Sequence, residues 1–307
     1  MTNFLVILVG LVGGYVLRKT GKVPTSASAG LNAWILTIAL PAVILKYVPQ
    51  IRWSPEVLFP LAAPLIVILG AWVFTRVASV FFRWSRNDRT AMFLTTGLAN
   101  TSFVGFPLIL AFYGASALTV GVLCDQVSFI LLATVGVGAA AAAQASNHTG
   151  APGRSLVATV AGRLLTFPPL LTFPVAILAP HFVDLSPLEP LFDALAATLA
   201  PMALFSVGLQ LSFTQARRGG KALVAGLVYK LLLAPFLVLG IALALGLSGP
   251  IAKIPIFEAA MAPMITSAVV AAEYDTSPHL ANAMVGIGIP VSLVTCVGWW
   301  FGLSFWT

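Results

Sequence analysis

Apolar residues fill most of this chain in long runs that short polar connections separate. A helix that crosses a membrane needs about 20 predominantly apolar residues, and ten runs approach or exceed this length. They are residues 3–17, 26–48, 56–82, 90–113, 115–143, 164–180, 190–212, 221–247, 254–273 and 279–305. Because almost no sequence remains outside them, the pattern predicts an all-α polytopic membrane protein with ten transmembrane helices and no separate soluble domain.

The fourth and ninth runs are interrupted by polar and helix-breaking residues, at positions 100–107 and 262–267. A proline inside a helix removes an N–H donor and clashes with the carbonyl four residues back. Irregular backbone at membrane depth persists only where protein or a water-filled cavity surrounds it. One broken helix in each half of a chain indicates the binding site of a secondary transporter. The candidate substrate-binding residues are Asn100, Thr101, Ser102, Gly105, Pro107, Pro263, Thr266 and Ser267.

Composition agrees with a membrane protein. The chain is 59% hydrophobic and 8% charged, with a mean hydropathy of +1.01, whereas about 25% of the residues in a soluble domain are charged. The net charge of +7 comes from Lys and Arg residues that flank the apolar runs, mostly after the first, third, fifth and seventh. The positive-inside rule places these connections in the cytoplasm and both termini outside, and a nucleic-acid partner is not expected.

The ten runs divide into two halves of five. An odd number per half inverts the second half relative to the first, which is the arrangement of inverted repeats. Short similarities support this division: residues 40–42 resemble 200–202, Pro107 corresponds to Pro263, and residues 127–129 resemble 291–293. We therefore expect repeats at residues 1–143 and 164–307, joined by a cytoplasmic linker at residues 144–163.

Asp125, Arg76 and Lys230 are the charged residues that we single out within apolar runs. An intramembrane carboxylate indicates function, and three roles are open to Asp125, which precedes Gln126: proton relay, cation binding, or an ion pair with Arg76 or Lys230. Lys230 is also a candidate counter-ion for a substrate. Arg76 is close enough to the end of its run to extend its side chain to the cytoplasmic interface.

The remaining polar residues have structural interpretations. Glu258 and Glu273 lie near the two ends of the ninth run and are expected at the membrane interface. Cys124 and Cys296 are expected to pack as small hydrophobic residues. The histidines, at positions 148, 181 and 279, all fall in connections, and no pair has the spacing of metal ligands. Neither a metal site nor a cofactor is expected.

The motif Asn100-Thr101-x-x-x-Gly105-x-Pro107, followed by Tyr113-Gly114, resembles the fourth-helix motif of the auxin efflux carrier family. This family includes the plant auxin exporters and bacterial relatives described as malonate or malate transporters. Further similar stretches follow in order along the chain, at residues 14–18, 31–32, 40–41, 201–208, 230–235 and 263–274.

The resemblance implies a ten-helix fold of the sodium/proton-antiporter or bile-acid-transporter type. Residues 1–48 and 164–212 would form a scaffold that dimerises, and residues 56–143 and 221–305 a mobile transport core. The broken helices would cross near Pro107 and Pro263, and transport would follow an elevator or rocking motion. The implied location is a bacterial inner membrane, with a homodimer as the assembly.

We therefore expect a carrier for a small organic anion such as a carboxylate, because the N-termini of broken half-helices carry partial positive charge. The alternative is a sodium- or proton-coupled symporter or antiporter of the same architecture that uses Asp125. An intramembrane enzyme is a remote alternative, since no histidine and no Gly-x-Ser-x-Gly sequence lies within an apolar run.

Overall fold

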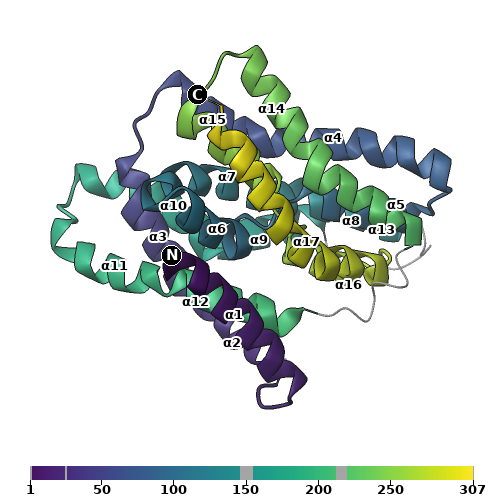
Figure 1. Ribbon diagram of the computed structural model, residues 1–307, viewed down its shortest axis with the longest axis horizontal. Helices are drawn as coiled ribbons and strands as arrows, with labels where there is room; N and C mark the ends of the chain where they lie inside the picture. The colour runs from purple at the N-terminus through teal and green to yellow at the C-terminus, as the bar shows by residue number, and fades with distance from the viewer. Residues whose placement is uncertain (1, 25, 146–154, 212–219, 307) are drawn as a thin grey trace. The chain divides into compact units, whose positions relative to one another are not determined.

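The computed structural model describes residues 2–24, 26–145, 155–211 and 220–306 (Figure 1). These residues fold into α-helices joined by short connections, with several π-helical and 3₁₀ turns. They form two compact units, each assembled from three segments of the chain. The first unit comprises residues 1–54, 102–126 and 164–211, and the second comprises residues 55–101, 127–163 and 212–307.

The first unit is built from the helices at the start of each predicted half, together with residues 102–126 from the fourth and fifth runs. They are α1 (Thr2–Lys19), α2 (Ala27–Trp34), α3 (Leu40–Tyr47), α6 (Phe106–Phe112), the first part of α7 (Leu118–Leu131), α10 (Pro168–Leu178), α11 (Glu189–Ala197) and α12 (Leu199–Gln210). A π-helical turn, Ile35–Ala39, connects α2 to α3 without a break.

Glycines bring α1 and α12 into close contact in the first unit. A Cβ atom on Gly14 would meet the carbonyl oxygen of Phe205, and one on Gly208 would meet that of Leu11, both closer than real Cβ atoms come. At Gly10 a Cβ atom would lie 2.8 Å from the Cβ of Leu204. Small residues in such rows let helix backbones approach in a membrane, where dispersion contacts drive packing.

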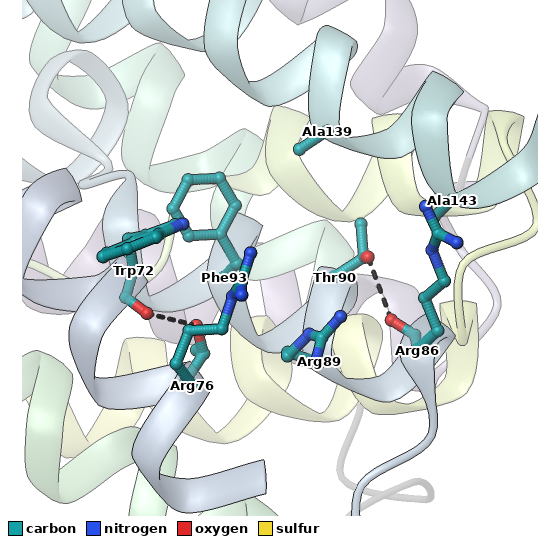
Figure 2. Close-up of a pocket in the computed structure, with 9 residues that line it drawn as sticks. Trp72, Arg76, Arg86, Arg89, Thr90, Phe93, Ala139 and Ala143 are labelled. Atoms are coloured by element: carbon teal, nitrogen blue, oxygen red, sulfur yellow. Dashed lines mark hydrogen bonds between the residues drawn. The ribbon is translucent and has the colours of Figure 1, made fainter.

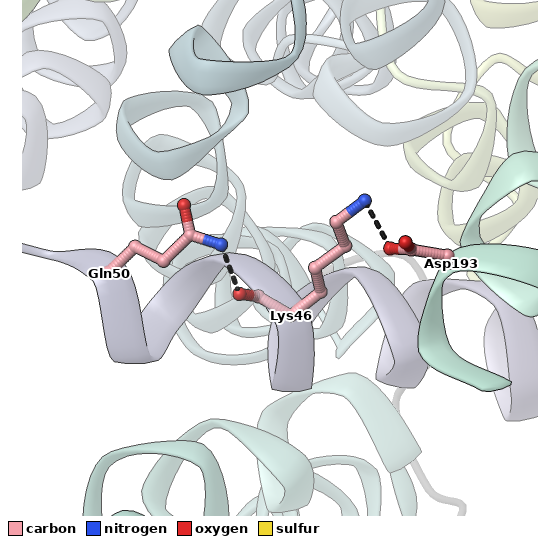
Figure 3. Close-up of polar contacts among 3 residues, drawn as sticks. All are labelled: Lys46, Gln50 and Asp193. Atoms are coloured by element: carbon pink, nitrogen blue, oxygen red, sulfur yellow. Dashed lines mark hydrogen bonds and ion pairs between the residues drawn. The ribbon is translucent and has the colours of Figure 1, made fainter. Parts of the chain in front are cut away.

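An ion pair joins α3 to α11. The Lys46 ammonium lies 2.5 Å from a carboxylate oxygen of Asp193, and the side-chain amide of Gln50 donates to the Lys46 carbonyl at 2.9 Å (Figure 3). The two charged side chains are partly exposed, so solvent screening keeps the stabilisation small.

The second unit contains the remaining helices, with its residues drawn from both predicted halves. They are α4 (Leu58–Phe82), α5 (Arg86–Gly97), α8 (Val137–Ala145), α9 (Leu156–Thr166, as far as residue 163), α13 (Gly220–Val228), α14 (Ala234–Ala244), α15 (Gly249–Ala259), α16 (Ile265–Glu273) and α17 (Pro278–Ser304). A cluster of buried methionine, leucine and alanine side chains packs α5 against α13 and α17.

Six helical stretches of the described residues are long and apolar enough to cross a membrane. They are Ala27–Gln50, Pro55–Phe82, Ala115–Ala145, Ser186–Gln210, Gly220–Ala244 and Pro278–Ser304. The pair α9 and α10, bent where they join, is a seventh candidate. The protein is therefore an integral membrane protein, and six or seven stretches of its described residues are candidate spans by length and composition. The three other predicted runs are residues 3–17 and the two interrupted ones.

Part of the predicted linker lies outside the described residues. This applies to residues 146–154, which include His148 and Arg154, and to the basic residues Arg217 and Arg218 of the connection after the seventh run.

Candidate functional site

Both interruptions predicted from the sequence are breaks in helices of the second unit. Helix α5 ends at Gly97, and Leu98 is extended, with φ −117° and ψ 124°. Helix α15 ends at Ala259, and Met264 is extended, with φ −63° and ψ 129°, before α16 begins. A hydrophobic run long enough to form one helix is thus divided at each place by a few residues of extended backbone.

The two extended segments pair with each other. The Asn100 N–H donates to the Ala262 carbonyl at 2.9 Å, and the Met264 N–H donates to the Leu98 carbonyl at 3.0 Å. These bonds flank the antiparallel bridge between Ala99 and Pro263. In such a pair the two central residues donate nothing to each other, so the missing N–H of Pro263 costs no hydrogen bond. We call this paired region, residues 98–100 with 262–264, the crossing.

The prediction that the crossing lies near Pro107 is wrong. Pro107 lies where the π-helical turn Thr101–Gly105 passes directly into α6, inside the continuous helical stretch Thr101–Phe112. The residue opposite Pro263 is Ala99, and the first break begins at Leu98. Gly105 and Ser102 lie in a π-helical turn, Thr101–Gly105, between the crossing and α6. The polar residues at 100–102 mark the break better than the proline does.

Asn100 provides an unused donor at the crossing. Its side chain is only 3% exposed, and the amide nitrogen Nδ2 has no hydrogen-bond partner among the described residues. Leaving a buried donor unsatisfied costs about 1–3 kcal/mol, so native proteins rarely keep one without a reason. Asn100, predicted to bind substrate, is thus buried with a donor that has no partner among the described residues, and its role in binding stays a prediction.

The carbonyl groups released by the second break already have donors. The Lys230 ammonium, which is fully buried, donates to the Ala259 carbonyl at 2.8 Å. The Cys296 thiol lies 3.6 Å from the Ala260 carbonyl oxygen, and the Ser267 hydroxyl donates to the Met264 carbonyl at 2.6 Å. The C-terminal end of a helix carries partial negative charge, which explains a buried cation at the end of α15.

These contacts change the roles expected for several residues. Ser267 uses its hydroxyl within its own turn, and Thr266 is exposed on α16 rather than buried at the crossing. The interfacial position expected for Glu258 is wrong, because Glu258 is 2% exposed in the last turn of α15 and interacts electrostatically with Lys230. Glu273 is at the surface as expected and forms an ion pair with Arg163.

Two of the residues predicted for ion coupling, Asp125 and Gln126, lie in the first unit, while Arg76 and Lys230 lie in the second. The Ser102 hydroxyl donates to the Asp125 carboxylate. Asp125 and Gln126 are each 3% exposed, and neither polar atom of the Gln126 amide has a partner among the described residues. The predicted pairing of Asp125 with Arg76 or Lys230 would join the two units and stays a prediction.

Sequence reasoning missed two residues that support the crossing. A Cβ atom on Gly288 of α17 would lie 2.5 Å from the Cδ atom of Pro263, so only glycine leaves room for the proline ring. The chain has 26 glycines, and nothing in the sequence distinguished Gly288 from the others. Cys296 was expected to be only a small hydrophobic residue, but its thiol also faces a carbonyl freed at the break. Groups of three or more metal-binding side chains are absent from the part of the chain that the structure describes.

Helices interrupted in the middle of apolar runs, with their extended segments paired deep in the protein, define a membrane transporter. The chain belongs to the family of membrane transport proteins whose model matches residues 1–159 and 169–300. This is the auxin efflux carrier family that the motif at residues 100–107 resembles. The protein is therefore a transporter and not an enzyme.

Two archaeal proteins are similar over nearly their whole length. An uncharacterized transporter of Methanothermobacter thermautotrophicus is 23% identical over 302 residues, with 95% of each chain covered. The uncharacterized transporter MJ1031 of Methanocaldococcus jannaschii is 21% identical over 309 residues, with 97% of each chain covered.

Proposed function

We propose that this transporter carries a small organic anion with a carboxylate group, and that the anion binds at the crossing. The observation that carries the proposal is the buried Asn100 side chain, whose Nδ2 donor lacks a partner among the described residues. A carboxylate is acceptor-only when ionised, so it complements a site that offers a donor.

The balance of donors and acceptors at the crossing supports an anion over a cation. The carbonyls of Leu98 and Ala262 accept from the paired backbone, and those of Ala259, Ala260 and Met264 face Lys230, Cys296 and Ser267. A cation would need such oxygens as ligands, and these five are already engaged. Helix α16 also begins directly after the crossing, with the partial positive charge of a helix N-terminus.

The finer architecture belongs to the same proposal. The chain would cross a bacterial inner membrane ten times, as two inverted repeats with both termini outside, and would work as a homodimer by an elevator motion. The three further spans would be α1 and the two broken helices. The halves of each broken helix are too short to cross the membrane alone. Thr101 and Ser102 would line the site, and Gly105, Pro107 and Pro263 would shape it.

A coupled mechanism is the second candidate, and the first unit favours it. The carboxylate of Asp125 accepts a hydrogen bond from Ser102, and the following residue of α7, Gln126, has a buried amide without a partner among the described residues. Carboxylate and amide oxygens suit a hard cation such as sodium, and a buried carboxylate can also carry a proton. An Asp125→Asn variant would then transport substrate without responding to a sodium or pH gradient.

The test is flux into liposomes that contain the purified full-length protein. A panel of mono- and dicarboxylates would be offered with and without sodium and pH gradients. We expect at least one carboxylate to move, and we expect Asn100→Ala to lower its flux by about tenfold or more, the value of one hydrogen bond to a charged acceptor.

Two further variants make the test specific. Asn100→Asp keeps the shape but replaces the donor with an acceptor, so it should lower the flux at least as much as Asn100→Ala. Asn282→Ala removes an exposed asparagine of α17 and should leave the flux unchanged. If the folded wild-type protein moves no carboxylate, or if Asn100→Ala transports like Asn282→Ala, the proposal is wrong.

A further inference from the structure

Three arginines converge on a small pocket in the second unit, apart from any residue of the crossing. The pocket has a volume of about 180 Å³ and lies between α4, α5 and α8. Arg76 comes from α4, while Arg86 and Arg89 come from the first turns of α5. Figure 2 shows their guanidinium groups around the pocket, with Trp72 beside Arg76.

No carboxylate neutralises this charge among the described residues. The pocket lining contains no Asp or Glu, and the ion pairs Lys46–Asp193 and Arg163–Glu273 involve none of the three arginines. Asp88, the acidic residue of α5, accepts hydrogen bonds from Ser85 and Ser277 instead. Three like charges repel one another, so an anion in the pocket would relieve that repulsion.

The arginines are held in place by local structure rather than by acidic partners. Ser85 caps the N-terminus of α5 through a reciprocal contact with Asp88. Because Arg86 and Arg89 are three residues apart in this helix, their side chains lie on the same face. Arg86 donates to the Ala142 carbonyl of α8 at 3.1 Å. The guanidinium of Arg76 lies over the ring of Trp72, 5.1 Å from its centroid. Most of the N–H donors of the three side chains are left for a ligand.

The surface beside the pocket is apolar. Trp72 and Val73 are each about half exposed, at 51% and 53%, and Val77 and Val80 further along α4 are 52% and 75% exposed. An exposed apolar helix face in a membrane protein contacts lipid chains. A ligand at this place can therefore have an anionic head in the pocket and acyl chains along α4.

We propose that the pocket binds a phosphate-ester anion, supplied by the headgroup of an anionic phospholipid. Guanidinium groups match the oxygens of a phosphate in pairs of parallel hydrogen bonds, and their weak hydration favours such sites. Basic pockets between transmembrane helices bind anionic lipid headgroups in this way. Arg76 is thereby assigned to a lipid site rather than to ion coupling.

The test compares lipid binding to the full-length protein and to arginine variants. Native mass spectrometry would count phosphatidylglycerol and phosphatidylcholine molecules bound to the detergent-purified protein, and calorimetry would measure binding of inorganic phosphate and glycerol phosphate. Arg76→Gln and Arg89→Gln would be made singly and together. Arg83→Gln is the matched control, because it removes the same charge between α4 and α5 but from a residue that does not line the pocket.

We expect preferential binding of phosphatidylglycerol, weakened by about fivefold for each pocket arginine removed and less than twofold by Arg83→Gln. Tight binding of the soluble phosphates with the same dependence on Arg76 and Arg89, but no lipid preference, would overturn the lipid source. Equal losses for Arg83→Gln and Arg89→Gln would overturn the pocket itself, since surface charge alone would then explain the binding. Melting temperatures of all variants establish that each remains folded.

Discussion

Replacing Gly288 by alanine should strain the crossing, because the new methyl group would press on the ring of Pro263. The added Cβ atom would lie 2.5 Å from Cδ and 3.1 Å from Cγ of Pro263, and 3.2 Å from a methyl group of Leu227. The leucine can rotate, but the proline ring is rigid and its neighbours are hydrogen-bonded to residues 98 and 100. Restoring ordinary contact distances requires a shift of roughly 1 Å, and overpacking of this kind costs about 1–3 kcal/mol.

A second glycine of α17 isolates this cost. Gly298 has no atom within 4 Å of its would-be Cβ, so Gly298→Ala gains only helix propensity, about 1 kcal/mol. Gly288→Ala gains the same helix propensity but also loses the stability that overpacking against Pro263 costs. The difference in free energy of unfolding between the two variants should therefore be about 1–3 kcal/mol, with Gly288→Ala less stable.

The assay is equilibrium unfolding in mixed micelles, followed by tryptophan fluorescence. Hydrogen exchange adds a local measurement, because the backbone amides of Asn100 and Met264 should exchange faster in Gly288→Ala than in Gly298→Ala. Two variants of equal stability with equally protected amides would refute the reasoning, since the proline ring would then have room to move at no cost.

Other contacts give further predictions. Gly208→Ala should destabilise the protein by about 1–3 kcal/mol, because the added methyl group meets the backbone of α1. Gly13→Ala is the control, since its methyl group would meet no atom within 4 Å and should not lower stability. Thermal unfolding of the two variants measures the difference. Lys230→Met should lower stability by about 2 kcal/mol because a buried carbonyl loses a charged donor, and unfolding midpoints unchanged from wild type would contradict this. Asp193→Asn should cost less than about 1 kcal/mol and lose its effect in high salt, because its ion pair with Lys46 is partly exposed.

The sequence predicted the places of both breaks because polar residues interrupt runs that are otherwise apolar. It did not predict the first residue of the first break, since the proline was given too much weight. Pro107 lies inside the helical stretch Thr101–Phe112, next to its π-helical turn, while Leu98 and Ala99 are extended although both are ordinary apolar residues. Their backbone bonds are made with residues more than 160 positions away, and local pattern carries no information on such pairing.

The burial of Glu258 and Lys230 at the end of α15 could not be predicted from the sequence either. Glu258 looked interfacial because it lies close to the start of an apolar run, but α15 is short and Glu258 is in its last turn, next to the break. Lys230 lies 28 positions before Glu258 in the sequence and Cys296 lies 38 positions after it, yet both contact this end of α15. Hydrophobic periodicity describes one helix at a time, so it cannot reveal which side chains surround the end of another.

The unsatisfied donor of Asn100 also bears on how a carrier of this kind would work. Left unsatisfied, this donor costs about 1–3 kcal/mol. Under the proposed function a bound carboxylate would recover that free energy, which corresponds to roughly fivefold to a hundredfold in affinity. The carbonyls around the break are already satisfied by Lys230 and Ser267, so binding requires no rearrangement of the backbone. Substrate affinity at the crossing would then depend on one side chain, and replacing it would change transport without unfolding the protein.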